Sequence, residues 1–170
     1  SIAGSNAMLH NDPKALKVSQ DLNSKVHFAD NAPAFGIPVP DTLATTKADL
    51  GSAKVAAFLA KHDNDVMLKI LGLSGARNVA AVDGLQACVD YVEEFPEDLD
   101  VVLQERLDLT QFTEMTVDLR ITPDDISIAN VRKIMFAEGL WVGNLIGPEV
   151  VLTDAHIAEL MRVGAYVREH

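Results

Sequence analysis

Hydrophobic and polar positions along this chain recur with two different periods, one helical and one extended. Between residues 48 and 62, Val55, Phe58 and Leu59 recur at the spacing of one helix face, which predicts an amphipathic helix. Asn11-Asp12-Pro13 offers a cap followed by a proline suited to a first helical turn, so a helix is expected from residue 13. Similar patterns predict helices through residues 23–35, ending at Gly36, and over 83–96 and 153–170.

Other segments carry the pattern of β-strands. Residues 66–71 and 101–103 are nearly continuous apolar runs, which is typical of strands buried on both faces. Residues 116–121 alternate polar and apolar, and the turn at 122–125 predicts a hairpin with a partner strand from Ile126. Shorter strands are expected at 43–46, 78–82 and 135–142.

The order of these elements indicates the fold class. Helices alternate with hairpins rather than with single parallel strands, so the chain is expected to be α+β with a largely antiparallel sheet, not a doubly wound parallel fold. Its 170 residues suit one medium domain or two small lobes that share a core.

Composition narrows the class of function. A formal net charge of −11 argues against a nucleic-acid surface, although a few converging lysines still suffice for a nucleotide. No apolar run is long enough to cross a bilayer, and no signal peptide is evident. Cys88 is the single cysteine, so we expect a buried inert thiol and a cytoplasmic setting. The five histidines show no metal-ligand spacing.

The strand at 66–71 carries the most suggestive chemistry. Lys69 interrupts its apolar run, and a turn of small residues follows at 72–77. A buried ammonium needs a partner, and the N–H groups of glycine and serine can point at an anion. The segment therefore fits a phosphate clamp, while a β-hairpin with its lysine on the solvated face remains the alternative.

Three features in order resemble the ATP-grasp superfamily, and most of all its carboxylase branch, typified by biotin carboxylase. Lys25 precedes the segment Gly36-Ile37-Pro38-Val39-Pro40, Lys69 precedes the glycine loop, and Gln104-Glu105-Arg106-Leu107 follows a buried run. The resemblance covers residues 11–147 and implies two small lobes with a mainly antiparallel sheet and packing helices.

The resemblance implies roles for residues that would bind ATP. Lys25 and Lys69 would bind the nucleotide phosphates, and a loop containing Gly72, Ser74 and Gly75 would close over the triphosphate. This loop has fewer glycines than is usual in the family, since Leu73, Ala76 and Asn78 stand where glycine is often found. For Lys25, a solvated position on a helix is the alternative.

The segment after the buried run would bind adenine. Gln104 would accept a hydrogen bond through its side chain, Glu105 would offer a backbone carbonyl and Leu107 a backbone N–H. Glu114 would bind the ribose hydroxyls. The alternative is an exposed polar strand end and a solvated glutamate. Candidate apolar walls around adenine, which could equally be core residues, are Leu71, Val79 and Leu103.

Magnesium would bridge the phosphates in this family, but its ligands are expected outside this chain. Asp118 and Glu138 are available carboxylates, yet neither belongs to the Glu-x-Asn pattern that family members use. Arg132 and Lys133 could face the triphosphate or an acidic substrate, or form a solvated basic pair.

The implied activity is that of a ligase or carboxylase, in which ATP converts a small carboxylate substrate into an acyl phosphate for attack by a nucleophile. A nucleotide-binding or regulatory lobe without turnover is one alternative, and a structural domain is another. We expect residues 1–7 to be a tag remnant, 8–62 a helical and linker segment, and 63–170 the nucleotide-binding lobes of a larger polypeptide, incomplete at the C-terminus.

Overall fold

The computed structural model describes residues 13–71, 78–108, 110–137 and 140–170. The chain divides into two compact units. Unit 1 comprises Ser1–Pro38 and Asp108–His170, and unit 2 comprises Val39–Leu107. The chain therefore leaves unit 1 once, forms unit 2 as a continuous segment, and returns.

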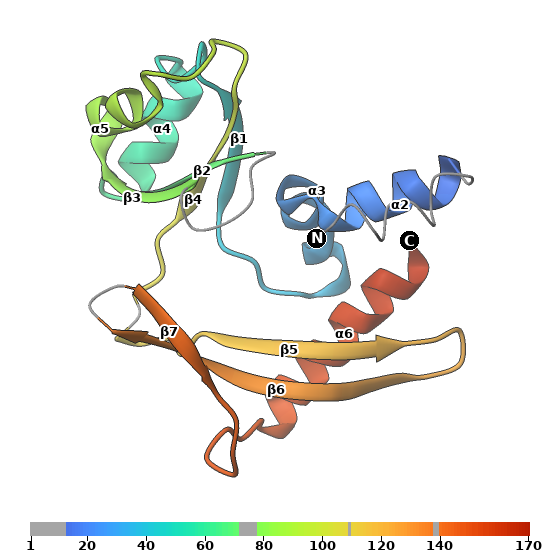
Figure 1. The fold of residues 1–170 in the computed structure, drawn as a ribbon. Coiled ribbons are helices and arrows are strands. Elements are labelled where there is room, and N and C mark those ends of the chain that lie inside the picture. Colours follow the sequence, from blue (N-terminus) through green and yellow to red (C-terminus); the bar gives the residue numbers. More distant parts are fainter. Residues whose placement is uncertain (1–12, 72–77, 109, 138–139) are drawn as a thin grey trace. The chain divides into compact units, whose positions relative to one another are not determined.

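Unit 2 is a four-stranded antiparallel sheet with helices on one face (Figure 1). The strand order is β1-β4-β2-β3. β4, the last strand of unit 2 in the sequence, therefore lies between β1 and β2 and pairs with both. Its elements are β1 (Thr42–Thr46), α4 (Ala53–Lys61), β2 (Asp65–Ile70), β3 (Val79–Asp83), α5 (Gly84–Val92) and β4 (Asp100–Glu105).

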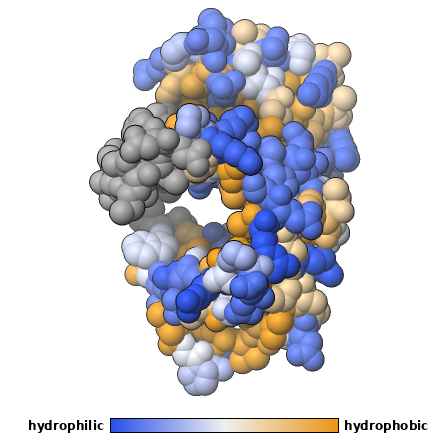
Figure 2. All heavy atoms as spheres, turned by 90° about the vertical axis from the view of Figure 1, so that its right-hand side faces the viewer, coloured by the Kyte–Doolittle hydropathy of each residue, from blue (hydrophilic) through white to orange (hydrophobic). Residues whose placement is uncertain are grey.

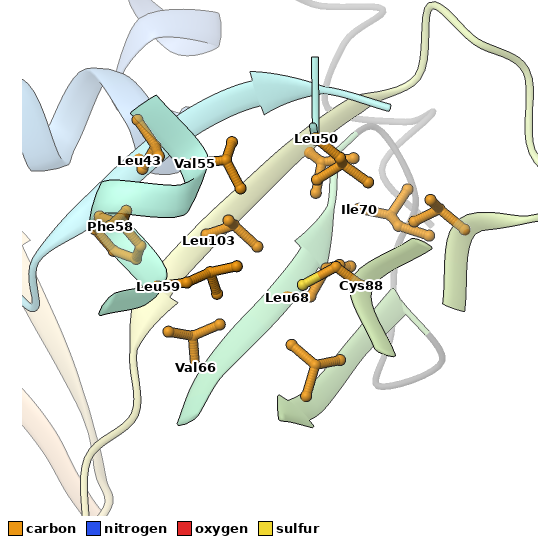
Figure 3. Packing of buried hydrophobic residues seen from close by; sticks show 13 residues of the cluster. Leu43, Leu50, Val55, Phe58, Leu59, Val66, Leu68, Ile70, Cys88 and Leu103 are labelled. Carbon is orange, nitrogen blue, oxygen red and sulfur yellow. The ribbon is translucent and has the colours of Figure 1, made fainter. Parts of the chain in front are cut away.

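The core of unit 2 lies between the sheet and helices α4 and α5 (Figure 3). Leu68 of β2 lies opposite Leu103 of β4, and both side chains are fully buried. Val55 and Leu59 of α4 and Cys88 of α5 pack onto the same cluster. Burial of one leucine contributes about 1.5–3 kcal/mol, so these contacts dominate the stability of the unit. Burial also raises the pKa of the Cys88 thiol, as expected for an inert cysteine.

Helix α4 begins later than the sequence pattern predicts. The predicted start at residue 48 is wrong, because residues 47–52 form turns and Leu50 enters the core from them. The helix begins at Ala53, where the Ser52 hydroxyl accepts a hydrogen bond from the Val55 N–H. A serine cap of this kind competes with continued helix on its N-terminal side.

Unit 1 combines a three-stranded antiparallel sheet, ordered β5-β6-β7, with helices (Figure 1). Helix α6 packs against β5 and β6, and Gly164 of α6 lies directly against Ile126. The elements are α2 (Pro13–Asn23), α3 (Lys25–Asn31), the 3-10 helix η1 (Ala32–Phe35), β5 (Met115–Ile121), β6 (Ile126–Ala137), β7 (Leu140–Leu145) and α6 (Asp154–Glu169).

Aromatic contacts join α6 to the N-terminal helices within unit 1. Tyr166 is 1% exposed and lies edge-on to Phe28 of α3 and Phe35 of η1, with ring centroids 5.4 and 5.3 Å apart. Gly36 then ends the helical segment at φ 68°, a conformation that favours glycine. The predicted end of this segment at Gly36 is confirmed.

The predicted strand at 135–142 is wrong. Met135, Phe136 and Ala137 complete β6, whereas Leu140 opens β7, so the chain reverses within the segment. The register places Phe136 opposite Trp141. An apolar run on each side of a reversal has the same composition as one longer strand, which is why the pattern misled the prediction.

The predicted fold class is confirmed: the protein is α+β, with two lobes, antiparallel sheets and packing helices. The sequence-based boundary between residues 62 and 63 falls inside unit 2, between α4 and β2. Within the described ranges, no helix has the length and apolar character needed to span a membrane. Figure 2 shows one face of the molecule, on which hydrophobic and hydrophilic residues both reach the surface.

Candidate functional site

The candidate site lies on the face of the unit 2 sheet opposite its helices. Side chains alternate between the two faces of a strand, and Val66, Leu68 and Ile70 of β2 belong to the helix-side core. Lys69 therefore points to the opposite face, together with Gln104 of β4. The same face of β1 carries Thr42, which lies directly opposite Gln104 in the register, and β3 contributes Val79 opposite Lys69.

A chain of polar contacts crosses three strands on this face. The Lys69 ammonium donates to Gln104 Oε1 over 2.5 Å, and Gln104 Nε2 donates to Thr42 Oγ1 over 2.9 Å. The Thr42 hydroxyl in turn donates to the Pro40 carbonyl over 2.8 Å. These groups are partly buried, where hydrogen bonds to a charged group contribute about 1.5–3 kcal/mol.

Two residues that the sequence singled out separately thus meet in space. Lys69 and Gln104 are 35 positions apart, and the pairing of β2 with β4 brings them together. Thr42 was missed by sequence reasoning. Its only signal is its position opposite Gln104, which becomes visible once β1 is known to pair with β4.

The end of β4 is fixed by a second set of contacts. Glu105 Oε2 accepts from the Asp41 N–H over 3.1 Å, and the Asp41 carbonyl accepts from the Glu105 N–H over 2.8 Å. Asp41 Oδ2 lies 2.5 Å from Lys61 Nζ and 2.8 Å from His62 Nε2. The pKa of the Asp41 carboxyl lies below its ordinary value of 3.8. The main cause is hydrogen bonding to Lys61, and hydrogen bonding to His62 is the second. Two hydrogen bonds therefore connect Asp41, near the start of unit 2, with Glu105, near its end.

The segment that follows Glu105 is more exposed. Arg106 pairs with Asp65 over 2.8 Å, and the Leu107 side chain is 37% exposed. Leu107 is also the last residue of unit 2. The backbone roles of Glu105 and Leu107 toward adenine stay predictions.

The apolar candidates divide between the two faces of the sheet. Leu103 lies in the helix-side cluster, so its alternative assignment as a core residue holds. Val79 is 38% exposed on the same face as Lys69 and remains a candidate wall. Val102 also faces this side, opposite Lys69 in the register, and it is fully buried without belonging to the helix-side cluster.

The other predicted site residues lie elsewhere in the chain. Lys25 is the exposed first residue of α3, and Glu114 is an exposed residue before β5 whose carbonyl accepts from the Ile134 N–H over 3.0 Å. Both belong to unit 1, whereas Lys69 and Gln104 belong to unit 2. The predicted loop residues Gly72, Ser74 and Gly75 lie outside the described residues.

The unit 1 sheet carries its own, partly buried ion pair. Arg132 Nη2 lies 2.6 Å from Asp118 Oδ2, which also accepts from Asn130 Nδ2 over 3.3 Å. Arg132 and Lys133 are consecutive residues of β6, so their side chains point to opposite faces and cannot both face one ligand. Glu138 lies outside the described residues, and no cluster of three metal-ligating side chains occurs among those described.

No family model matches this sequence, and no curated protein does so either. Solved structures do match. Carboxyaminoimidazole ribonucleotide synthase from Aspergillus clavatus, complexed with ATP, superposes with a TM-score of 0.67 at 15% identity, over 89% of this chain and 39% of that chain. D-alanyl-alanine synthetase A from Vibrio cholerae gives 0.66 at 16% identity, over 89% and 49%.

A RimK domain protein, ATP-grasp, from Sphaerobacter thermophilus gives a TM-score of 0.59 at 16% identity, over 89% of this chain and 52% of that chain. This chain thus spans roughly two fifths to one half of the solved chains that it resembles. At such low identity, the likeness concerns the fold. The described architecture is therefore that of the ATP-grasp fold.

Proposed function

We propose that this chain is the ATP-binding part of an ATP-grasp ligase, which activates a small carboxylate substrate as an acyl phosphate. The observation that carries this proposal is the contact between Lys69 and Gln104 on the helix-free face of the unit 2 sheet. The likeness in fold to a synthase whose structure contains ATP supports it.

The two side chains offer complementary groups to a nucleotide. An ammonium has three donors and a full charge, which suits a phosphate oxygen. An amide oxygen has two lone pairs, so Gln104 Oε1 can accept from Lys69 and also from an exocyclic amine of adenine. The neighbouring Val79, which is 38% exposed, supplies apolar surface for the purine ring.

The remaining predicted ligands extend the proposal. Lys25 would bind phosphate, Glu114 would bind the ribose hydroxyls, and Gly72, Ser74 and Gly75 would contribute backbone N–H groups. Glu105 and Leu107 would read the adenine edge through their backbone. Among the described residues no cluster fits magnesium. The ligands of this ion would belong to other parts of a larger polypeptide, since the chain spans 39% of the solved synthase that it resembles.

In phosphoryl transfer, a protein contributes mainly positioning and charge neutralisation. The residues proposed above would bind and orient the triphosphate, while the carboxylate substrate and the nucleophile would be bound by other parts of the polypeptide. The alternative, in which the chain binds nucleotide without turnover, makes the same contacts and differs only in lacking phosphoryl transfer to a carboxylate.

Calorimetric titration with ATP, with and without magnesium, tests the proposal. Replacing Lys69 by alanine is expected to weaken ATP binding about tenfold or more, because a charge-assisted contact is lost. The matched control is Lys54→Ala, which removes the same charge from an exposed position of α4, on the helix side of the sheet. This control should leave ATP affinity within about twofold of the parent.

Three outcomes are distinct. No heat with ATP for the parent would contradict nucleotide binding. Equal affinity of the parent and Lys69→Ala would remove Lys69 from the site. ATP binding without ADP release in the presence of candidate carboxylic acids would favour the binding lobe over the ligase.

A further inference from the structure

The amide of Gln104 has one preferred orientation, which its two neighbours Lys69 and Thr42 both favour. We infer that Thr42 is a specificity-determining residue, which makes the site select a 6-aminopurine over a 6-oxopurine by holding the amide oxygen of Gln104 toward Lys69. This inference rests on the proposed nucleotide-binding function and adds the basis of its choice between adenine and guanine.

The hydrogen bonds that Thr42 can form determine which group of the Gln104 amide lies beside it. A threonine hydroxyl has one proton, and Thr42 donates it to the Pro40 carbonyl over 2.8 Å. Only lone pairs of Oγ1 then remain for Gln104. The group 2.9 Å away must therefore be the donating –NH₂ rather than the carbonyl oxygen.

The Lys69 side fixes the other end independently. An ammonium has donors and no acceptor, so the Gln104 atom 2.5 Å from Lys69 Nζ must be the oxygen. Rotating the amide by half a turn would place –NH₂ against the ammonium and the oxygen against the Thr42 lone pairs. Both hydrogen bonds would be lost together, so the two neighbours stabilise the same orientation.

This orientation distinguishes purines by the group at position 6. Adenine has an amine there, which can donate to the remaining lone pair of Gln104 Oε1. Guanine has a carbonyl oxygen, which cannot donate and would meet the amide oxygen as a second acceptor. Sites built to hydrogen-bond one group discriminate strongly against an analogue that leaves a polar group unpaired.

Thr42 matters only because residue 104 is a glutamine. A glutamate has oxygen at both ends of its carboxylate, so it would accept from adenine in either orientation and need no neighbour to hold it. The two ends of an amide differ, and Lys69 at one end and the Thr42 hydroxyl at the other supply the difference in environment. This contrast provides a matched background in which the effect of Thr42 should vanish.

The test measures dissociation constants for ATP and GTP on the full chain. Thr42→Val has nearly the same shape but lacks the hydroxyl. Because Lys69 still favours the same amide orientation, the variant should reduce the ratio of GTP to ATP dissociation constants about fivefold, the effect of one lost neutral hydrogen bond. Thr42→Ser keeps the hydroxyl and should retain the parent ratio within about threefold. In a Gln104→Glu background, adding Thr42→Val should change the ratio by less than about twofold.

A second measurement follows the amide without any nucleotide. In NMR spectra, the Nε2 protons of Gln104 should exchange with solvent more slowly in the parent and in Thr42→Ser than in Thr42→Val. Circular dichroism confirms that each variant is folded. If the Nε2 protons of Gln104 in the parent exchange as fast as those of an exposed glutamine, the hydrogen bond from Gln104 to Thr42 is contradicted.

The outcomes separate the inference from the proposed function. If the parent binds ATP and Thr42→Val keeps the parent ratio, the inference is overturned and the function stands. The inference is also overturned if Thr42→Val changes the ratio equally with glutamine and with glutamate at 104, because the effect would not pass through the amide. If the parent binds neither nucleotide, the proposed function fails and the specificity role falls with it.

Discussion

The two units of this protein are built from similar elements, but they bury their apolar side chains to different degrees. In unit 2, two helices cover one face of the sheet, and Leu68, Leu103 and Val55 are sealed from solvent. In unit 1, the buried apolar residues among those described are Ala32, Ile37 and Tyr166. Its sheet is covered by α6 through side chains that are mostly half-buried.

Unit 1 also exposes large apolar side chains. Trp141 and Ile146 are 62% and 73% exposed, and Val142 of β7 is 60% exposed. The hydrophobic contribution to folding scales with the apolar area removed from water. The free energy of unfolding per residue should therefore be larger for unit 2 than for unit 1. Unit 1 should be the more easily opened of the two.

Matched leucine truncations give the largest effect. Leu68→Ala in unit 2 should lower the free energy of unfolding by about 2–5 kcal/mol, because it leaves a cavity in a closed core. Leu119→Ala removes the same atoms from β5, where the side chain is half-buried, and should cost about 1–2 kcal/mol. Denaturant unfolding, monitored by hydrogen exchange of the amides in each unit, measures the loss of unfolding free energy in both variants. A loss for Leu119→Ala that equals or exceeds the loss for Leu68→Ala would contradict the comparison of the two units.

Glycine replacements give the next effect. A Cβ at Gly164 would lie 2.5 Å from Ile126 Cγ2 and 3.1 Å from its Cδ1, so Gly164→Ala forces α6 away from the sheet of unit 1. Overpacking costs about 1–3 kcal/mol, and the gain in helix propensity offsets about 1 kcal/mol of it, so a net loss is expected in thermal unfolding.

Unit 2 contains the control for this change. A Cβ at Gly51 would meet no atom within 4 Å, so Gly51→Ala should be neutral or slightly stabilising. Adding Ile126→Ala to Gly164→Ala should recover part of the loss if the clash is its cause. Without such recovery, the effect would have to arise elsewhere in α6.

The same contrast explains what could be predicted from the sequence. The strands of unit 2 were evident because 66–71 and 101–103 are apolar runs, and those runs are buried on the core side. The helical period around Val55 and Phe58 was equally plain. In unit 1, the reversal after Ala137 was missed, because apolar residues continue on both sides of it and burial there is shallow.

The candidate site was predictable only in part. Lys69 was conspicuous as a charge within an apolar run, and Gln104 as a polar residue ending one. Their contact, and the hydroxyl of Thr42 beside them, depend on β4 pairing with both β2 and β1. Pairing between strands far apart in sequence leaves no local pattern, since each strand carries the same alternation whichever neighbour it has.

The smallest expected effect concerns two aspartates, one in each unit. Asp41 connects β1 of unit 2 to Lys61 and His62 at the end of α4, whereas Asp21 pairs with Lys17 four residues away in α2. Hydrogen bonding to Lys61 lowers the pKa of Asp41, and hydrogen bonding to Lys17 lowers that of Asp21. A lowered folded-state pKa stabilises the protein above the unfolded value of 3.8, and this contribution is lost as the pH falls through the folded value.

Melting temperatures of the parent, Asp41→Asn and Asp21→Asn between pH 2.5 and 7 measure the two contributions. The difference between parent and Asp41→Asn should be present at neutral pH and shrink below about pH 4, because the protonated carboxyl no longer pairs with a cation. Asp21→Asn should show a smaller difference, since its pair lies on one exposed helix and orders no long-range contact. A larger effect at Asp21 would mean that the helices of unit 1 depend on this charge more than their burial indicates.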